Sequence, residues 1–131
     1  MQPRLTSLDH LVLTVSDLDQ TIAFYRDVLG MEPVSFGSPP RFAMQFGTQK
    51  INLHQVTQEF EPKARHPSPG SADLCFLTAH PLDDWQAHLS EHRVQIEDGP
   101  VHRTGATGPL CSIYIRDPDG NLIEISQLLP A

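Results

Sequence analysis

Four side chains that can bind a metal ion stand inside apolar runs of this sequence. They are His10 in "LDHLVLTV", His54 in "INLHQV", Asp73 in "ADLCFL" and Glu124 in "NLIEIS". A buried carboxylate or imidazole needs a partner, because its charged form loses hydration in an apolar environment. A divalent cation is one such partner, since it accepts neutral imidazole and carboxylate as ligands. The four residues therefore predict a divalent metal site.

Each of the four runs has the composition of a β-strand, in which successive side chains point to opposite faces. Each candidate then lies on the face opposite the strand's large aliphatic residues. A single histidine in a strand is more often a hydrogen-bonded core or rim residue, and a single glutamate more often lies on a solvated face. Four such residues at corresponding places favour the metal site over these alternatives.

The elements that position these residues follow from hydrophobic periodicity and turn signals. We expect strands at 8–15, 32–37, 41–47, 49–56, 72–79 and 94–101, a hairpin over 108–126 that turns at 117–120, and helices within 16–30 and 81–92. The segment 57–71, "TQEFEPKARHPSPGS", is rich in Pro and charge and predicts a linker or surface loop.

The expected elements repeat in the order βαβββ, which indicates a duplicated module. Module 1 covers about 6–56 and module 2 about 72–128, and we expect residues 1–131 to form a single domain. Aligning the modules by their sequence places His10 opposite Asp73 and His54 opposite Glu124.

Composition limits the function classes. The chain has 131 residues, 39% of them hydrophobic, with a formal net charge of -7. Its nine Lys and Arg residues form no block, which argues against nucleic acid as a partner. No apolar run reaches about 18 residues and the N-terminus lacks an apolar signal core, so we expect a soluble, cytoplasmic protein with no membrane partner. Cys75 and Cys111 stand in apolar stretches and are expected to be buried free thiols.

Three segments, "LDHLVLTVSDLDQTIAFYRDVLGM", "INLHQV" and "SIYIRDPDGNLIEIS", resemble the vicinal oxygen chelate superfamily. That superfamily includes glyoxalase I, fosfomycin-resistance enzymes, extradiol dioxygenases and bleomycin-binding proteins. "HPSPGSADLCFLT" and "RTGATGP" further resemble the glyoxalase-domain-containing protein 5 group. The resemblance implies an α+β fold of two βαβββ modules that form an incomplete barrel around a metal. It also implies a homodimer in which one site can take strands from both subunits.

The same resemblance implies a set of metal ligands. His10 and Glu124 match common ligand positions of the superfamily, and His54 occupies a position that glyoxalase I often fills with glutamate. Asp73 stands where histidine or glutamate is commoner; its shorter side chain could instead orient His10 or His54 from outside the coordination sphere. The protein ligands therefore number three or four, and the ion is Zn, Ni, Co, Mn or Fe.

Function follows from the ligand count. Members of the superfamily use the ion to hold two adjacent substrate oxygens and stabilise negative charge on them. Four protein ligands suit a glyoxalase-I-like lyase or isomerase of a small oxygenated or thiol-conjugated substrate, with Glu124 as the proton-transferring base. Three ligands resemble the two-His-one-carboxylate face of Fe(II) oxygenases, hence an extradiol-type dioxygenase, or the fosfomycin thiol transferases. A ligand-binding protein of the bleomycin-resistance type, without catalysis, is the remaining alternative.

Other residues offer weaker signals. Arg103, in "HRTGATGP", could hold an anionic substrate group, although a solvated loop arginine is an equal alternative. Tyr114 is expected to pack in the hairpin and Trp85 in the helix core. His88 and His92 are expected on the protein surface.

Overall fold

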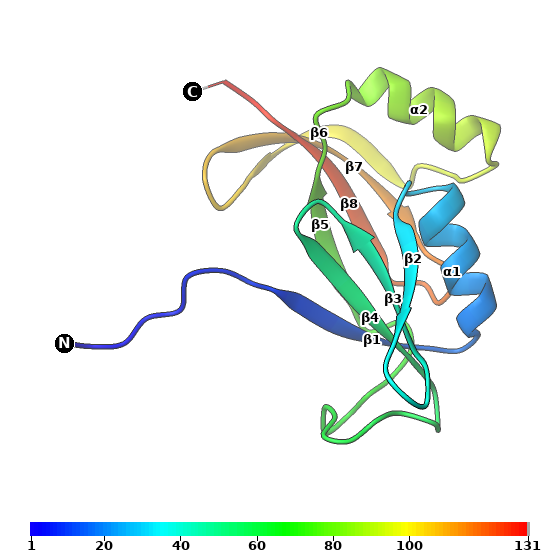
Figure 1. The fold of residues 1–131 in the computed structure, drawn as a ribbon. Helices are drawn as coiled ribbons and strands as arrows, with labels where there is room; N and C mark the ends of the chain where they lie inside the picture. Colours follow the sequence, from blue (N-terminus) through cyan, green and yellow to red (C-terminus); the bar gives the residue numbers. More distant parts are fainter. Residues whose placement is uncertain (131) are drawn as a thin grey trace. The chain divides into compact units, whose positions relative to one another are not determined.

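The structure, a computed structural model, describes residues 1–130 and divides into two compact units (Figure 1). Unit 1 covers Met1–Ser68 and unit 2 covers Pro69–Ala131. The boundary falls within the predicted linker 57–71, so each unit contains one predicted module.

Unit 1 is a four-stranded sheet with one helix. Its elements are β1 (His10–Val15), α1 (Leu18–Asp27), β2 (Glu32–Phe36), β3 (Arg41–Phe46) and β4 (Gln49–Gln55). The strand order is β1-β4-β3-β2, with β1 parallel to β4 and the other pairs antiparallel. The first and last strands of the module thus lie side by side, which brings their polar residues onto one surface.

Unit 2 repeats this topology. Its elements are β5 (Asp73–Leu77), α2 (Leu82–Glu91), β6 (Asp98–Thr104), β7 (Pro109–Arg116) and β8 (Leu122–Leu128). The strand order is β5-β8-β7-β6, and β5 runs parallel to β8. The predicted order βαβββ is confirmed in both units. One strand was misplaced: 94–101 was expected, whereas β6 begins at Asp98 and has a register irregularity between Asp98 and Val101.

Helix α1 begins where the sequence provides a capping residue. The Asp17 carboxylate accepts a hydrogen bond from the backbone N–H of Gln20 at 3.0 Å, which satisfies one of the free donors of the first turn. Thr21 and Tyr25 are the buried residues of the helix, and α1 contacts β2, β3 and β4. The helix side of this unit therefore forms its core and leaves the other sheet face to polar residues.

The core of unit 2 consists of alternating aliphatic residues on the two central strands. The fully or nearly fully buried members are Ile113, Ile115, Ile123 and Ile125. Helix α2 buries Leu82 and Leu89, and the Trp85 indole N–H donates to the Thr78 hydroxyl at 2.9 Å.

Among residues 1–130, no helix combines the length and apolar character needed to cross a bilayer.

Candidate functional site

In unit 1 the two candidate histidines share one sheet face. His10 of β1 pairs with Lys50 of β4, and His54 of β4 pairs with Thr14 of β1. Paired residues of neighbouring strands point to the same side, so both imidazoles lie on the face opposite α1. They are offset by four residues, roughly 13 Å along the strands. Both side chains must lean over the centre of this face to contact one ion.

His10 has the surroundings of a metal-binding histidine. Its Nδ1 lies 2.9 Å from the Asp9 carboxylate, and the side chain is 42% exposed. A carboxylate that accepts from Nδ1–H fixes the ring orientation and leaves Nε2 with a free electron pair. The sequence prediction did not include Asp9, although its position next to His10 was visible.

His54 is more buried than His10 and has different neighbours. The residue is 3% exposed, and the Arg41 guanidinium donates to its Nε2 at 3.3 Å. The ring also contacts Phe60 edge-on, with centroids 5.7 Å apart. Burial, followed by the nearby Arg41 charge, lowers the pKa of His54. The imidazole is therefore neutral, as a ligand must be, but Arg41 must move before Nε2 can bind an ion.

The lowered pKa of His54 predicts a dependence of stability on pH. A depressed pKa in the folded state means that the unfolded chain binds the proton more readily as the pH falls below the ordinary value of 6.5. The free energy of unfolding should therefore decrease as the pH is lowered through that value. Urea unfolding of wild type and His54→Gln at several pH values measures it; the variant should lose this part of the decrease.

The control for this experiment is His92→Gln, because His92 is an exposed residue at the end of α2. It should keep the wild-type pH dependence. The lowered pKa would be contradicted if His54→Gln and wild type lost the same free energy between neutral and mildly acidic pH.

In unit 2, Glu124 lies at the centre of the polar sheet face. It pairs with Cys75 of β5 on one side and with Tyr114 of β7 on the other. Asp73 shares this face and is exposed. It pairs with Leu122, which lies two residues before Glu124 on β8. The structure thus places both predicted carboxylates of module 2 on one surface, with Glu124 the more enclosed.

Hydroxyl groups surround the Glu124 carboxylate. The Ser126 hydroxyl donates to Glu124 Oε2 at 3.2 Å, and Ser126 Oγ lies 2.6 Å from the Ser112 hydroxyl and 3.2 Å from Cys75 Sγ. Since Ser126 uses its single hydrogen toward Glu124, Ser112 and Cys75 donate to it. Hydrogen bonds in such a chain strengthen one another. This network explains how a carboxylate is accommodated within the apolar sequence "LIEI".

Tyr114 lies between Glu124 and Arg103. It pairs with Glu124 across β7 and β8, and the Arg103 Nε donates to the Tyr114 hydroxyl at 2.9 Å, with Arg103 Nη2 3.6 Å from Asp98. Desolvation, and then the Glu124 charge, raises the pKa of Tyr114, so the phenol keeps its proton. Arg103 therefore orients Tyr114 on the Glu124 face, and its part in binding a substrate stays a prediction.

Two sequence interpretations need correction. Tyr114 was expected to pack, but its hydroxyl accepts from Arg103 on the face of Glu124; the hairpin turn at 117–120 could have revealed this, because it places Tyr114 opposite Glu124. Cys75 was expected to be buried, but the residue is exposed on the polar face, and Cys111 is half-buried. Desolvation of the thiol, together with Glu124, raises the pKa of Cys75. Both cysteines are free, as expected.

Strand register also corrects the alignment of the two modules. His10 pairs with Lys50, and Asp73, its predicted counterpart, pairs with Leu122. Two residues further along β4 and β8 stand Asn52 and Glu124. The counterpart of Glu124 in unit 1 is therefore Asn52 and not His54, so the two sequence pairings cannot both hold. No role of Asn52 was predicted from the sequence.

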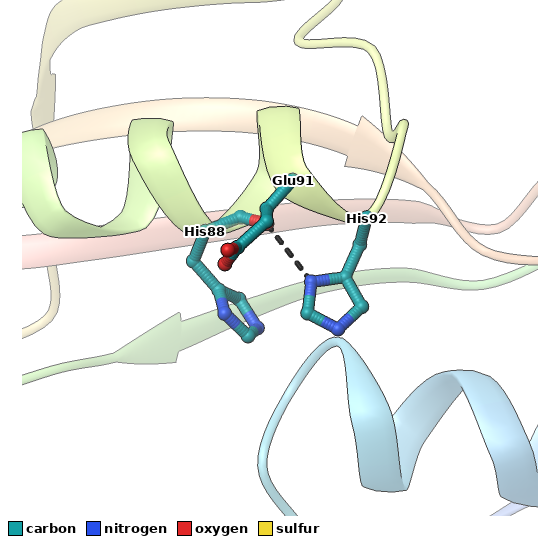
Figure 2. Close-up of side chains that lie close together, drawn as sticks. All are labelled: His88, Glu91 and His92. Atoms are coloured by element: carbon teal, nitrogen blue, oxygen red, sulfur yellow. Dashed lines mark hydrogen bonds between the residues drawn. The ribbon is translucent and has the colours of Figure 1, made fainter.

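A separate group of possible metal ligands lies at the C-terminal end of α2. Within residues 1–130, His88, Glu91 and His92 form the one group whose three ligand atoms lie within 4.8 Å of one another. Figure 2 shows them on successive turns, with His92 Nδ1 donating to the His88 carbonyl at 3.0 Å. Helical spacing by itself brings residues i, i+3 and i+4 together. This surface group includes none of the predicted ligands, and metal measurements must separate it from them.

The fold and these polar faces can be compared with known proteins. The sequence profile of the Glyoxalase/Bleomycin resistance protein/Dioxygenase superfamily matches residues 7–125. The chain belongs to this superfamily. The resemblance stated from the sequence is thereby confirmed at the level of the superfamily, and with it the α+β fold class.

Two relatives of high sequence identity do not specify a reaction. The virulence protein STM3117 of Salmonella typhimurium is 61% identical over 120 residues, which cover 92% of this chain and 83% of the relative. Its crystal structure matches with a TM-score of 0.94 at 57% identity and covers 97% of this chain and 100% of that one. The glyoxalase domain-containing protein RDO1 of Mycosarcoma maydis is 60% identical over 121 residues, 92% of this chain and 68% of the relative.

More distant relatives carry names of enzymes. A metallothiol transferase FosB of Staphylococcus epidermidis is 30% identical over 122 residues, which cover 92% of this chain and 81% of the relative. The crystal structure of a lactoylglutathione lyase from Agrobacterium tumefaciens matches with a TM-score of 0.73 at 26% identity, over 95% of this chain and 96% of that one. The superfamily of this chain thus includes metalloenzymes.

Proposed function

We propose that this protein is a divalent-metal-dependent lyase or isomerase of the glyoxalase I type, acting on a small oxygenated or thiol-conjugated substrate. The observation that carries the proposal is Glu124, a carboxylate at the centre of a polar sheet face, held by the Ser126 hydroxyl and with Tyr114 beside it on β7. The names of the FosB and lactoylglutathione lyase relatives support a metal-dependent reaction on a thiol compound.

The proposed ligands are His10, His54 and Glu124, with Asp73 as a fourth or as an orienting carboxylate. Two neutral imidazoles and a carboxylate are a donor set that Zn, Ni, Co, Mn and Fe accept. The contact between His10 and Asp9 fits this role, and so does the lowered pKa of His54. When bound, the ion supplies a positive charge that stabilises negative charge on substrate oxygens.

Glu124 is proposed as the group that moves the substrate proton. A carboxylate accepts a proton from the carbon next to a carbonyl and returns it to the neighbouring carbon, which completes an isomerisation. Ser126 donates to this carboxylate and fixes its direction, and Tyr114 stands beside it on β7. Tyr114 is protonated at neutral pH, so its hydroxyl can act as a donor throughout the reaction.

The first test is the metal content of the purified protein, measured by mass spectrometry after incubation with each candidate ion. We expect about one ion per chain that survives extensive dialysis. The double variant His88→Ala/His92→Ala removes the surface group on α2 and should retain this ion. Loss of the ion in that variant, or its absence from wild type after loading with every candidate, would contradict the proposal.

The reaction type is tested with the loaded protein and the hemithioacetal of glutathione and methylglyoxal. A lyase or isomerase converts it without oxygen and with a redox-inert ion such as Zn²⁺. Consumption of O₂ that requires Fe²⁺ or Mn²⁺ would indicate a dioxygenase instead.

The proposal includes a homodimer, which the family resemblance implies. Sedimentation of the loaded protein measures the oligomeric state.

A further inference from the structure

Asn52 is a buried polar residue whose side-chain oxygen lacks a partner. It is 7% exposed, and within residues 1–130 its Oδ1 receives no hydrogen bond. A buried carbonyl oxygen without a donor is costly, and proteins rarely retain one without a reason. Asn52 lies at the centre of the polar face of unit 1, at the place that Glu124 takes in unit 2.

Two cations of the same face lie on either side of Asn52. Lys50 is two residues before it on β4, and Arg41 of β3 lies beside His54, two residues after it. Both contact one aromatic ring, that of Phe36: Lys50 Nζ is 4.0 Å and Arg41 Cζ 5.7 Å from its centroid. The two charges therefore lie next to the same aromatic ring, on one face of the sheet.

Neither cation has a carboxylate partner in the part of the chain that the structure describes. Two other cations of unit 1 do: Arg26 pairs with Asp27 at 2.8 Å, and Lys63 with Glu59 at 3.3 Å. Arg41 and Lys50 are half-buried instead, with aromatic rings and an imidazole as neighbours. An aromatic ring attracts a cation but carries no net negative charge, so it does not neutralise the cation. A half-buried cation without a counterion therefore attracts anions strongly.

The polar groups of this face can bind two different parts of one ligand. Arg41 and Lys50 offer donors to an oxyanion, and arginine matches a carboxylate or phosphate in two hydrogen bonds. Asn52 Oδ1 needs a donor, which a hydroxyl group supplies. Val12, which pairs with Asn52 on the edge strand β1, is 45% exposed, so the face can be approached from that edge.

We propose that the face formed by Arg41, Lys50 and Asn52 binds the oxyanion of a small hydroxylated acid, with the two cations on the oxyanion and Asn52 Oδ1 accepting from the hydroxyl. This proposal rests on the proposed function where it names the substrate class: an oxygenated compound that carries a negative charge. The binding itself needs only unit 1 and can be measured without turnover.

Calorimetric titration of the full-length protein with glycolate and acetate tests the subsite. The two anions share a carboxylate, and glycolate alone carries a hydroxyl next to it. We expect glycolate to bind more tightly than acetate. Arg41→Gln and Lys50→Gln should each lower the affinity for glycolate by about tenfold. Arg26→Gln removes a cation of α1, off this face, and should bind as wild type does.

Asn52→Leu should remove the preference for glycolate over acetate while acetate binding persists. If that variant does not fold, the wild-type comparison decides: equal affinities for glycolate and acetate overturn the role of Asn52. Glycolate affinity unchanged in both Arg41→Gln and Lys50→Gln overturns the subsite.

Glycolate also chelates metal ions, so Glu124→Gln is titrated as well. Glycolate binding that disappears in Glu124→Gln and is unchanged in Arg41→Gln and Lys50→Gln belongs to the metal and overturns the subsite. Binding that persists in Glu124→Gln and weakens in the two cation variants supports the subsite even where the metal-dependent reaction fails.

Discussion

Replacement of Glu124 by glutamine is expected to lower the turnover of the metal-loaded protein by about a hundredfold to ten-thousandfold. Glutamine keeps the shape and can still accept from Ser126, but it cannot take up a proton and is a poor metal ligand. The fold should persist, since the Glu124 side chain is half-buried and its hydroxyl neighbours can hydrogen-bond an amide. Steady-state kinetics and metal content, measured on the same preparation, report the two effects.

The matched control is Glu97→Gln. Glu97 is an exposed carboxylate that pairs with Arg116 at 3.0 Å in the same unit. Its replacement should leave turnover and metal content at the wild-type level. Tyr114→Phe, which removes the hydroxyl beside Glu124, should have an intermediate effect and retain the metal. Wild-type turnover in Glu124→Gln would exclude Glu124 as the base.

Asp117→Ala should lower the free energy of unfolding by about 3 kcal/mol or more, because it leaves several buried donors without an acceptor. The carboxylate accepts from the backbone N–H of Asp119 at 2.9 Å and that of Asn121 at 2.9 Å, and from Asn121 Nδ2 at 2.8 Å. Asp117 is 6% exposed and Asn121 1%. Asn121 in turn accepts from the Ala72 N–H at 2.9 Å, so the turn also positions the start of β5.

Thermal unfolding measures this effect, and a decrease in Tm of about 10 °C is expected for a chain of this size. Asp119→Ala is the control: it removes a carboxylate from the same turn and preserves the backbone N–H that donates to Asp117. This substitution should lower the free energy of unfolding by less than about 1 kcal/mol. Equal losses in the two variants would show that the Asp117 network contributes no more than an ordinary turn residue.

The elements of this fold follow from local signals in the sequence. Alternating aliphatic residues predicted the strands, and apolar residues at helical spacing predicted the first helix within 16–30. In the structure the helix begins after Asp17, because a short polar side chain before an amphipathic run satisfies the helix's free donors. Repetition of these signals predicted two modules of the same order. The strand at 94–101 was misplaced because the irregularity before Val101 breaks the alternation on which the prediction depended.

The residue types of the candidate site were also visible in the sequence. His10, His54, Asp73 and Glu124 all lie on the polar faces of their sheets, as strand alternation predicted. Alternation fixes the face of a side chain, but it does not fix which residue of a neighbouring strand stands beside it. For that reason the sequence placed His54 opposite Glu124, whereas the register gives that place to Asn52.

The sequence by itself determined the order of the elements, the superfamily and the chemical character of the polar faces, because each depends on local pattern. The tertiary structure decided which side chains touch: Ser126 donates to Glu124, Arg103 donates to Tyr114, and Arg41 donates to Nε2 of His54. Such contacts join residues that lie far apart in the chain or on neighbouring strands. They depend on strand register and side-chain direction, which only the packed sheet fixes.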